Sequence, residues 1–152
     1  KLKGEPFATE YAMPVFDRVT PRPPVADMSK AKIALVTSGG IVPFGNPDHI
    51  AASSAQNFGE YDITGVTDLL QGKYQTAHGG YDQTYANQDP DRVLPVDVLR
   101  EEVSAGRLGA LEPEVCVATG NCASVAASQD IGRQIAAELL NKGVNAAILT
   151  ST

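Results

Sequence analysis

The sequence has 152 residues, of which 43% are hydrophobic and 20% are charged, a balance typical of one globular domain with a buried core. Its net charge of -6, with twelve basic residues that form no run, argues against a nucleic-acid-binding protein, because phosphate recognition requires clustered Lys and Arg. No apolar stretch approaches the roughly 20 residues that cross a membrane, and the first residues do not resemble a signal peptide. Two cysteines six apart give no disulfide framework, so we expect free thiols in a reducing cytoplasm.

Residues 1–30 predict an extended, Pro-rich arm or linker. Prolines recur throughout this segment, and Arg22-Pro23-Pro24 favours polyproline II over helix. The arm also carries apolar side chains that would pack against a neighbouring surface, namely Tyr11, Val15 and Phe16. We place the boundary at residue 30, followed by an α/β domain over residues 31–152.

The first regular element of that domain is a strand. Residues 32–37 form a near-continuous apolar run that ends at Ser38-Gly39-Gly40, as expected of a parallel strand buried on both faces. Residues 41–91 are irregular and contain both histidines, and within them residues 61–66 predict a second strand.

The rest of the chain alternates helices and strands. Residues 95–106 predict a helix, because Val96, Leu99 and Val103 share one face and Gly106 suits its C-cap. Residues 115–118 predict a buried strand, residues from 124 or 128 to 142 a helix with Gly143 as its C-cap, and residues 144–150 another buried strand. This order predicts a three-layer α/β fold with a mostly parallel sheet and right-handed crossovers.

An α/β domain normally follows a buried strand with a loop and a covering helix, and nothing of this kind follows residue 150. We therefore expect that the domain is truncated at its C-terminal end and belongs to a larger enzyme. Ligand sites in such sheets lie at the carboxyl ends of the strands.

Three strand ends carry small polar residues that predict a substrate-binding site. Hydroxyls and free backbone N–H groups at strand tips, followed by a helix N-terminus, favour a carboxylate or phosphate. The alternative is that Ser, Thr and Gly simply form turns and N-caps there. The candidate residues are Thr37, Ser38, Gly39, Gly40, Gly120, Asn121, Thr150, Ser151 and Thr152.

Two residues are candidates for catalysis. Cys122 lies just before a predicted helix, whose N-terminus stabilises a thiolate, whereas Cys116 lies mid-strand and predicts an inert core thiol. His78 lies between Thr76-Ala77 and Gly79-Gly80, where Tyr81 and Asp82 would orient it for proton transfer, or where it would simply bond to backbone. His49 is expected to fix its own loop.

Several familiar sites are absent from the sequence. The two histidines have no zinc-ligand spacing, and two cysteines six apart give neither a disulfide framework nor a four-ligand site, so we expect no metal. There is no GxGxxG after a strand, no GxxxxGK[ST] and no GxSxG, which disfavours NAD, ATP and serine-hydrolase chemistry.

With these motifs in view, the sequence resembles the selenoprotein subunit of component B of the glycine/sarcosine/betaine reductases, relatives of D-proline reductase. The resemblance covers about residues 30–152. It rests on residues 34–43 (ALVTSGGIVP), 45–48 (GNPD), 61–63 (YDI), 76–82 (TAHGGYD), 85–87 (YAN), 91–97 (DRVLPVD) and 146–152 (AAILTST).

The resemblance implies an oxidoreductase subunit that reductively cleaves the C–N bond of glycine, sarcosine or betaine. It implies a selenocysteine directly after Thr152, then two cysteines, so that the chain ends where the selenocysteine codon stands and is inactive alone. It also implies two partners, a subunit of component B with a pyruvoyl group and the small selenoprotein component A. Cys122 departs from the family pattern, in which a small non-thiol residue is common at this position.

Three alternatives remain open at this stage. Residues 119–124 (TGNCAS) are similar to the cysteine loop of aspartate/glutamate racemases, which predicts a cofactor-independent racemase that uses Cys122. Asn121-Cys122 is also compatible with the self-cleavage site of the pyruvoyl-bearing subunit. Finally, the chain by itself would serve as a non-catalytic binding or assembly module, with the arm docked on a partner.

Overall fold

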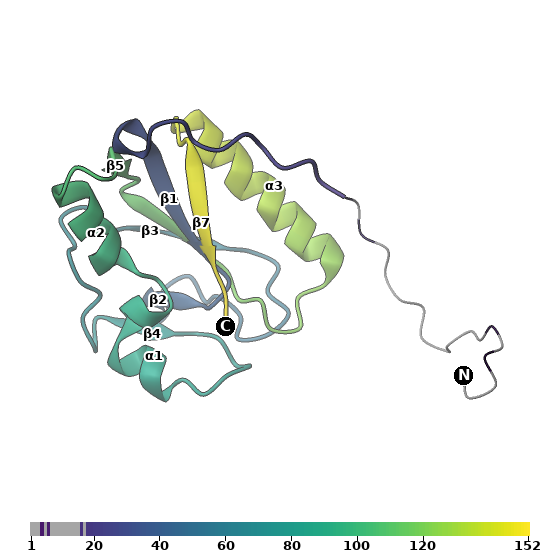
Figure 1. The fold of residues 1–152 in the computed structure, drawn as a ribbon. Coiled ribbons are helices and arrows are strands. Elements are labelled where there is room, and N and C mark those ends of the chain that lie inside the picture. Colours follow the sequence, from purple (N-terminus) through teal and green to yellow (C-terminus); the bar gives the residue numbers. More distant parts are fainter. Residues whose placement is uncertain (1–3, 5, 7–15, 17) are drawn as a thin grey trace.

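The computed structural model describes residues 4, 6, 16 and 18–152, and its centre is a five-stranded sheet (Figure 1). Strand β1 (Lys32–Thr37) pairs in parallel with β7 (Ala146–Thr150) along one edge. Along its other edge it pairs in parallel with β5 (Ala110–Leu111) and then with β6 (Glu114–Val117). Strand β3 (Gly59–Asp62) runs antiparallel to β6 and closes that side. Across the sheet the order is therefore β3, then β6 with β5, then β1, then β7.

One helix covers each face of this sheet. Helix α3 (Val125–Asn141) packs on the face that presents Ala34 and Cys116. Helix α2 (Val96–Ser104) packs on the opposite face, which presents Ile33 and Leu35. The structure thus confirms the three-layer α/β fold with a mostly parallel sheet.

Below the carboxyl ends of the strands lies a small layer of short elements (Figure 1). Strands β2 (Ile41–Pro43) and β4 (Tyr74–Thr76) form an antiparallel pair. The helix α1 (Thr84–Gln88) and the 3-10 turn η2 (Pro90–Arg92) follow it, while another 3-10 turn, η1 (Met28–Lys30), precedes β1. This layer carries the loop with His78 toward the end of the main sheet.

Most of the predicted elements form at the expected places. The strands at 32–37, 115–118 and 144–150 correspond to β1, β6 and β7, and the helices correspond to α2 and α3. The last strand was expected to be buried, but three of the five residues of β7 are exposed, because it pairs on one side only within the described residues. The strand expected at 61–66 forms earlier, as β3, and is antiparallel; the β2–β4 pair was not predicted. Of the arm's apolar side chains, Phe16 is exposed, while Tyr11 and Val15 lie outside the described residues. The boundary at residue 30 stays a prediction.

Local sequence explains where α3 begins and ends. Ser124 has an extended backbone and its side chain accepts a hydrogen bond from the Ala127 N–H at 3.1 Å, which caps the N-terminus. Its core-facing residues Ile131, Ile135 and Leu139 are spaced by four and are buried against the sheet. Gly143 follows the helix at a φ of +72°, a left-handed conformation that glycine adopts without strain.

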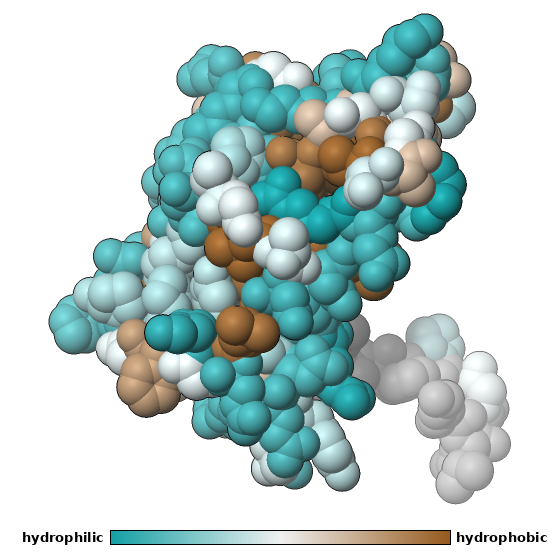
Figure 2. All heavy atoms as spheres, turned by 90° about the vertical axis from the view of Figure 1, so that its left-hand side faces the viewer, coloured by the Kyte–Doolittle hydropathy of each residue, from teal (hydrophilic) through white to brown (hydrophobic). Residues whose placement is uncertain are grey.

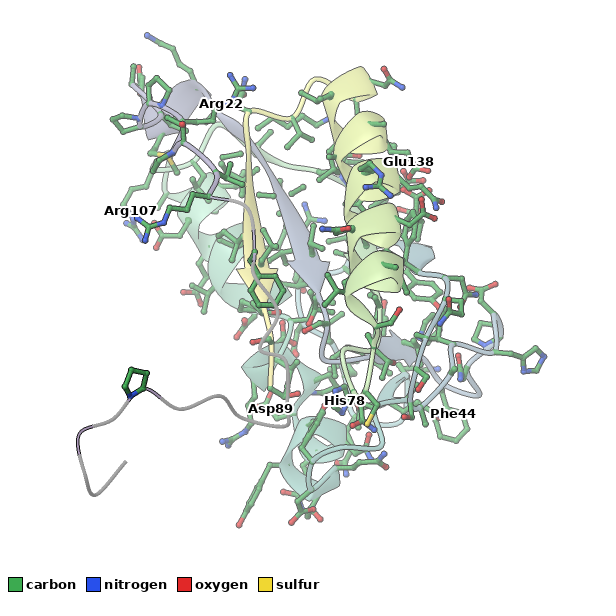
Figure 3. All side chains as sticks on the ribbon, turned by 90° about the vertical axis from the view of Figure 1, so that its right-hand side faces the viewer. Arg22, Phe44, His78, Asp89, Arg107 and Glu138 are labelled. Carbon is green, nitrogen blue, oxygen red and sulfur yellow. The ribbon has the colours of Figure 1, made fainter. Side chains whose placement is uncertain are left out.

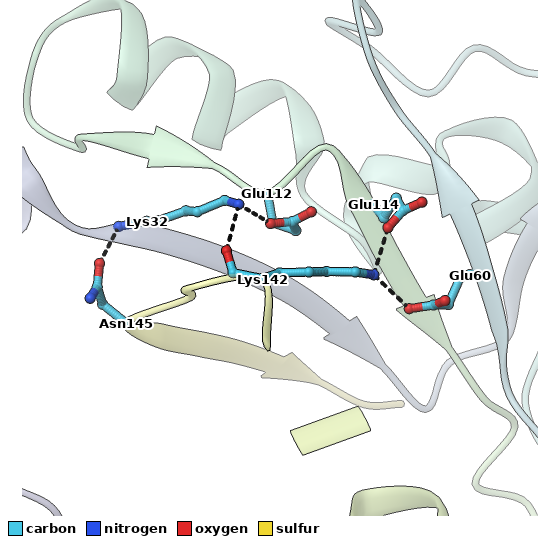
Figure 4. A network of polar contacts seen from close by, with 6 residues as sticks. All are labelled: Lys32, Glu60, Glu112, Glu114, Lys142 and Asn145. Carbon is cyan, nitrogen blue, oxygen red and sulfur yellow. Dashed lines mark hydrogen bonds and ion pairs between the residues drawn. The ribbon is translucent and has the colours of Figure 1, made fainter. Parts of the chain in front are cut away.

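Charged side chains cluster near the amino ends of the parallel strands (Figure 4). Lys32 Nζ lies 2.5 Å from the buried carboxylate of Glu112, and Lys142 Nζ lies 2.9 Å from Glu60 and 2.5 Å from Glu114. The carboxylates of Glu114 and Glu60 raise the pKa of Lys142. These ion pairs join β1, β3, β6 and the end of α3 at the end of the sheet opposite the strand tips.

The α2 side of the surface is mostly hydrophilic, with separate hydrophobic patches (Figure 2). No helix in the described part of the chain is long and apolar enough to cross a membrane.

Candidate functional site

The predicted strand tips converge on one cavity of about 410 Å³, which lies between α3 and the carboxyl ends of β1, β6 and β7. Residues from all three tips line it, and none of the lining side chains is charged. Five of the nine predicted substrate-binding residues line it: Thr37, Ser38, Gly120, Thr150 and Ser151. The other predicted residues of the tips, Gly39, Gly40, Asn121 and Thr152, are not part of this lining.

Strand alternation divides the hydroxyls of the tips between the two faces of the sheet. Val36 packs with the core under α3, so the next side chain, Thr37, points to the opposite face and Ser38 to the α3 face. Thr150 is in register with Thr37, so its side chain also points away from α3 and that of Ser151 points toward α3. Ser38 and Ser151 therefore present their side chains to the cavity, while the threonines face the layer that carries His78.

Backbone N–H groups at the tips are already used within the protein. Those of Ser38 and Gly40 donate to the carbonyls of Thr150 and Ala118, both at 3.0 Å. The Gly39 N–H donates to Thr37 Oγ1 at 3.0 Å, and the Gly120 N–H to the Ser38 carbonyl at 2.9 Å. The expectation of free N–H groups is therefore wrong at these four positions, because the turns consume their own donors.

The polar capacity that remains in the cavity is a set of serine hydroxyls. Within the described part of the chain, the hydroxyls of Ser38, Ser128 and Ser151 form no hydrogen bond, so each is able to donate to a ligand. Ser128 and Ala123 bring the N-terminal end of α3 to the cavity. The partial positive charge at a helix N-terminus favours an anion there. An apolar wall of Ile131, Ile135 and Leu149 faces these polar groups.

His78 lies beyond the carboxyl ends of the strands, near the N-terminal end of α3, whereas Glu138 lies toward the opposite end of that helix (Figure 3). Its Nδ1 accepts a hydrogen bond from the Gly80 N–H at 3.0 Å, so the neutral ring carries its proton on Nε2. Burial lowers the pKa of His78, which keeps the ring neutral at pH 7. The expectation that His78 bonds to backbone is confirmed, and its neutral ring presents a donor.

A chain of hydroxyls holds the His78 loop against the tip of β1. Tyr81 OH lies 2.8 Å from Thr76 Oγ1 and 3.0 Å from the Gly39 carbonyl, and Thr76 Oγ1 also donates to that carbonyl at 3.0 Å. The Tyr81 ring lies 4.8 Å from the His78 ring, centroid to centroid. The Tyr81 ring thus contacts His78 while its hydroxyl bonds to the tip, whereas Asp82 accepts from the Thr84 N–H at 2.9 Å.

Close approach at Gly40 joins the tip of β1 to the same loop. Gly40 has a φ of +71°, and a Cβ placed on it would lie 2.9 Å from His78 N and 3.2 Å from Thr119 Oγ1. The hydroxyls of Thr119 and Thr150 are buried on this face without a hydrogen-bond partner among the described residues. Each such group costs about 1–3 kcal/mol.

Asn121 ties together the loops around His78. A Cβ on Gly80 would lie 2.8 Å from both His78 Cε1 and Asn121 Oδ1, so the three residues are in close contact. The Asn121 carbonyl accepts from the Ser54 N–H at 2.8 Å, which draws in a serine-containing loop that sequence reasoning missed. Only its Ser53-Ser54 pair marked it, and such pairs are common in surface loops.

The two cysteines occupy opposite environments. Cys122 is exposed at a φ of +53°, with its Sγ 3.5 Å from Asn121 Oδ1. Cys116 is buried under α3, and burial raises the pKa of its thiol to about 12, as expected of an inert core thiol. A racemase requires two reactive thiols, and Cys116 does not supply the second. No group of three or more potential metal ligands occurs among the residues that the structure describes.

A protein-family comparison tests the resemblance drawn from the sequence motifs. The model of the family described as glycine/sarcosine/betaine reductase selenoprotein B matches residues 1–152. The chain belongs to this family. The resemblance drawn from the sequence motifs is therefore confirmed.

Curated relatives in this family carry reductase names. The glycine reductase complex component B subunit gamma of Carboxydothermus hydrogenoformans is 59% identical over the whole chain, and that of Peptoclostridium litorale is 55% identical. The sarcosine reductase complex component B subunit beta of Peptoclostridium acidaminophilum is 49% identical. The chain spans 35% of the length of each of these relatives. No solved structure matches the chain.

Proposed function

We propose that this chain is part of the substrate-specific selenoprotein subunit of a glycine reductase, in which it forms a wall of the substrate site. The observation that supports this most directly is the convergence of three strand tips on one uncharged, hydroxyl-lined cavity in a member of this family. Because the chain is only part of the length of its relatives, we expect it to be inactive by itself.

The order of sequence identities favours glycine as the substrate. The glycine reductase subunits are 55–59% identical to the chain, the sarcosine reductase subunit 49% and the betaine reductase subunit 41%. D-proline reductase subunit gamma, at 28% identity, is more distant. Sarcosine and betaine are the alternatives that a substrate comparison would test.

Reductive cleavage of glycine breaks its C–N bond with two electrons and two protons, and gives acetate and ammonium. In this proposal the hydroxyls of Ser38 and Ser151 donate to the substrate carboxylate, and the N-terminal end of α3 favours its negative charge. The apolar wall with Leu149 lies beside the α-carbon. His78, whose Nε2–H is a donor, and Cys122, an exposed thiol, remain the candidates for catalysis, although neither lines this cavity.

The redox group and the partners come from the family resemblance. We propose that a selenocysteine follows Thr152 in the full protein; a selenol is ionised at neutral pH and supplies a strong nucleophile and reductant. The partners proposed are a pyruvoyl-bearing subunit of component B, which takes the amine, and component A.

Activity of the complete complex tests the proposal. Substrate-dependent release of ammonium or amine is measured with glycine, sarcosine and betaine, using the full polypeptide, its partner subunit, component A and a dithiol reductant. Glycine is expected to have the highest kcat/KM. Activity with none of the three would contradict the reductase proposal, and a higher value for another substrate would contradict glycine.

Variants of the cavity test the site separately. Ser38→Ala and Ser151→Ala each remove one hydrogen bond to a charged group, worth about 1.5–3 kcal/mol, and are expected to raise KM by roughly 10-fold or more. Ser104→Ala, at an exposed position on α2, is the matched control and leaves KM unchanged. Unchanged KM in both cavity variants would show that the serines do not bind the substrate.

The mass of the full polypeptide and the codon after Thr152 test whether a selenocysteine follows. A codon for an ordinary residue there would contradict the proposal.

A further inference from the structure

The two edge strands of the sheet differ in the way they meet solvent. Strand β3 exposes Glu60 and Asp62, and charged side chains on an edge strand oppose pairing with further chains. Strand β7 has the sequence AAILT, with neither a charge nor a proline, and three of its five residues are exposed. The β3 edge therefore has the composition of a true edge, and β7 has that of an interior strand.

Neighbouring residues in register show how much of β7 is uncovered. Leu149 is 76% exposed, although its register partner Val36 packs into the core under α3. Ile148 is 39% exposed, although its partner Leu35 is fully buried. Both faces of β7 are thus open at the same point, on a strand that pairs with β1 on one side only within the described part of the chain.

The topology fixes the face on which a covering element would lie. The chain passes from β1 to β6 through α2, which lies on one face of the sheet. It then passes from β6 back across β1 to β7 through α3, which lies on the other face. The two crossovers run in opposite directions across the sheet and lie on opposite faces, so they have the same handedness. A crossover that continues past β7 with this hand must cross the α3 face.

That face has an open groove where such a crossover would pass. The cavity between α3 and β7 is lined on this side by Leu149, Gly132 and Ser128, two of them small residues on α3. A Cβ on Gly132 would meet nothing within 4 Å, so the helix surface here is open. Leu140, farther along α3, is 74% exposed. One helix beside α3 followed by one strand beside β7 would cover Leu149 and the strand edge from outside. Such a unit would wall off the cavity on this side without filling its serine-lined end at the strand tips.

We propose that β7 is an interior strand in the full-length protein, paired in parallel with a further strand of the same polypeptide, whose connecting helix packs beside α3 over Leu149. The relatives provide enough chain for this, because this chain spans 35% of their length. A parallel strand requires a crossover of a dozen or more residues, usually helical. A single intrachain β-α unit explains an open edge and an open groove on the same side.

Site-resolved labelling of the full-length polypeptide without its partners tests this proposal. The test variant is Leu149→Cys, and the matched control is Val98→Cys at a position on α2 that is 50% exposed. Each is placed in a Cys122→Ser background. Alkylation at each position is read by peptide mass spectrometry, relative to the rate after unfolding in denaturant. Leu149→Cys is expected to be protected by on the order of 100-fold, at every protein concentration, and Val98→Cys by less than about 10-fold.

Three results would overturn the proposal. Alkylation of Leu149→Cys as fast as that of Val98→Cys in the isolated polypeptide would show that nothing in the same polypeptide covers β7. Protection that appears only at high protein concentration would assign this edge to a second copy, and protection that requires the partner subunit would assign it to that subunit. Hydrogen exchange of the amides of β7 in the unsubstituted polypeptide provides the same test without a change in the core: slow exchange supports the proposal, and exchange at the rate of an open edge contradicts it.

Discussion

Gly40→Ala should destabilise the protein far more than an alanine at an open turn. The residue combines a φ of +71°, which costs an L-residue about 1 kcal/mol, with a Cβ position only 2.9 Å from His78 N and 3.1 Å from His78 Cβ. The first of these neighbours is backbone and cannot rotate away. Overpacking of this kind costs about 1–3 kcal/mol. The expected total is roughly 2–4 kcal/mol.

Two other glycines separate the two contributions. Gly72 has a φ of +78° with nothing within 4 Å of its Cβ position, so Gly72→Ala carries only the conformational cost of about 1 kcal/mol. Gly132 lies inside α3 with equally open surroundings, so Gly132→Ala should stabilise by about 0.5–1 kcal/mol through helix propensity.

Equilibrium urea denaturation followed by circular dichroism measures all three variants. With an m value of about 2 kcal/mol/M, the midpoint should fall by roughly 1–2 M for Gly40→Ala and by about 0.5 M for Gly72→Ala. Equal losses in these two variants would refute the reasoning, because they would mean that the contact between the tip of β1 and the His78 loop is absent or yields without cost.

Three further predictions concern capping, burial and pH. Ser124→Ala removes the cap of α3 and should cost about 1 kcal/mol in urea denaturation, whereas Ser124→Asp keeps the acceptor and most of the stability; equal losses would contradict the cap. Lys32→Met leaves the buried carboxylate of Glu112 unpaired and should cost about 3 kcal/mol, and adding Glu112→Gln should recover much of this loss; no recovery would contradict the pairing. Burial raises the pKa of Asp91 to about 6, above its value of about 3.9 in the unfolded chain, so the folded state binds the extra proton between these values. The free energy of unfolding should therefore fall as the pH rises from about 4 to 6, and an unchanged slope in Asp91→Asn would contradict this assignment.

The elements that the sequence predicted are those whose periodicity is local. Continuous apolar runs marked β1, β6 and β7, and residues such as Ile131 and Ile135 at a spacing of four marked α3. The antiparallel direction of β3 was not predicted, because direction depends on which strand it pairs with. The β2–β4 pair was not predicted either, since two strands of three residues carry too little pattern to distinguish them from loops.

The candidate site was predictable in position but only partly in chemistry. Convergence of the tips follows from parallel strands alone, and the division of Thr37 from Ser38 follows from strand alternation, which a closer reading of the sequence would have given. The use of the N–H groups within the turns could not be predicted, because it depends on the close pairing of Gly39 with Thr119. The place of His78 likewise depends on a contact between segments that are far apart in the chain.

The ion pairs of Lys32 and Lys142 have a consequence for how such a protein can change during evolution. They join the strands at their amino ends, while the cavity lies at the carboxyl ends. A substitution at Ser38 or Ser151 therefore leaves the charged network intact. Single substitutions can therefore change which molecule fits the cavity while the protein stays folded after each substitution. Diversification of reductases for related amines on one shared scaffold is the outcome that this separation permits.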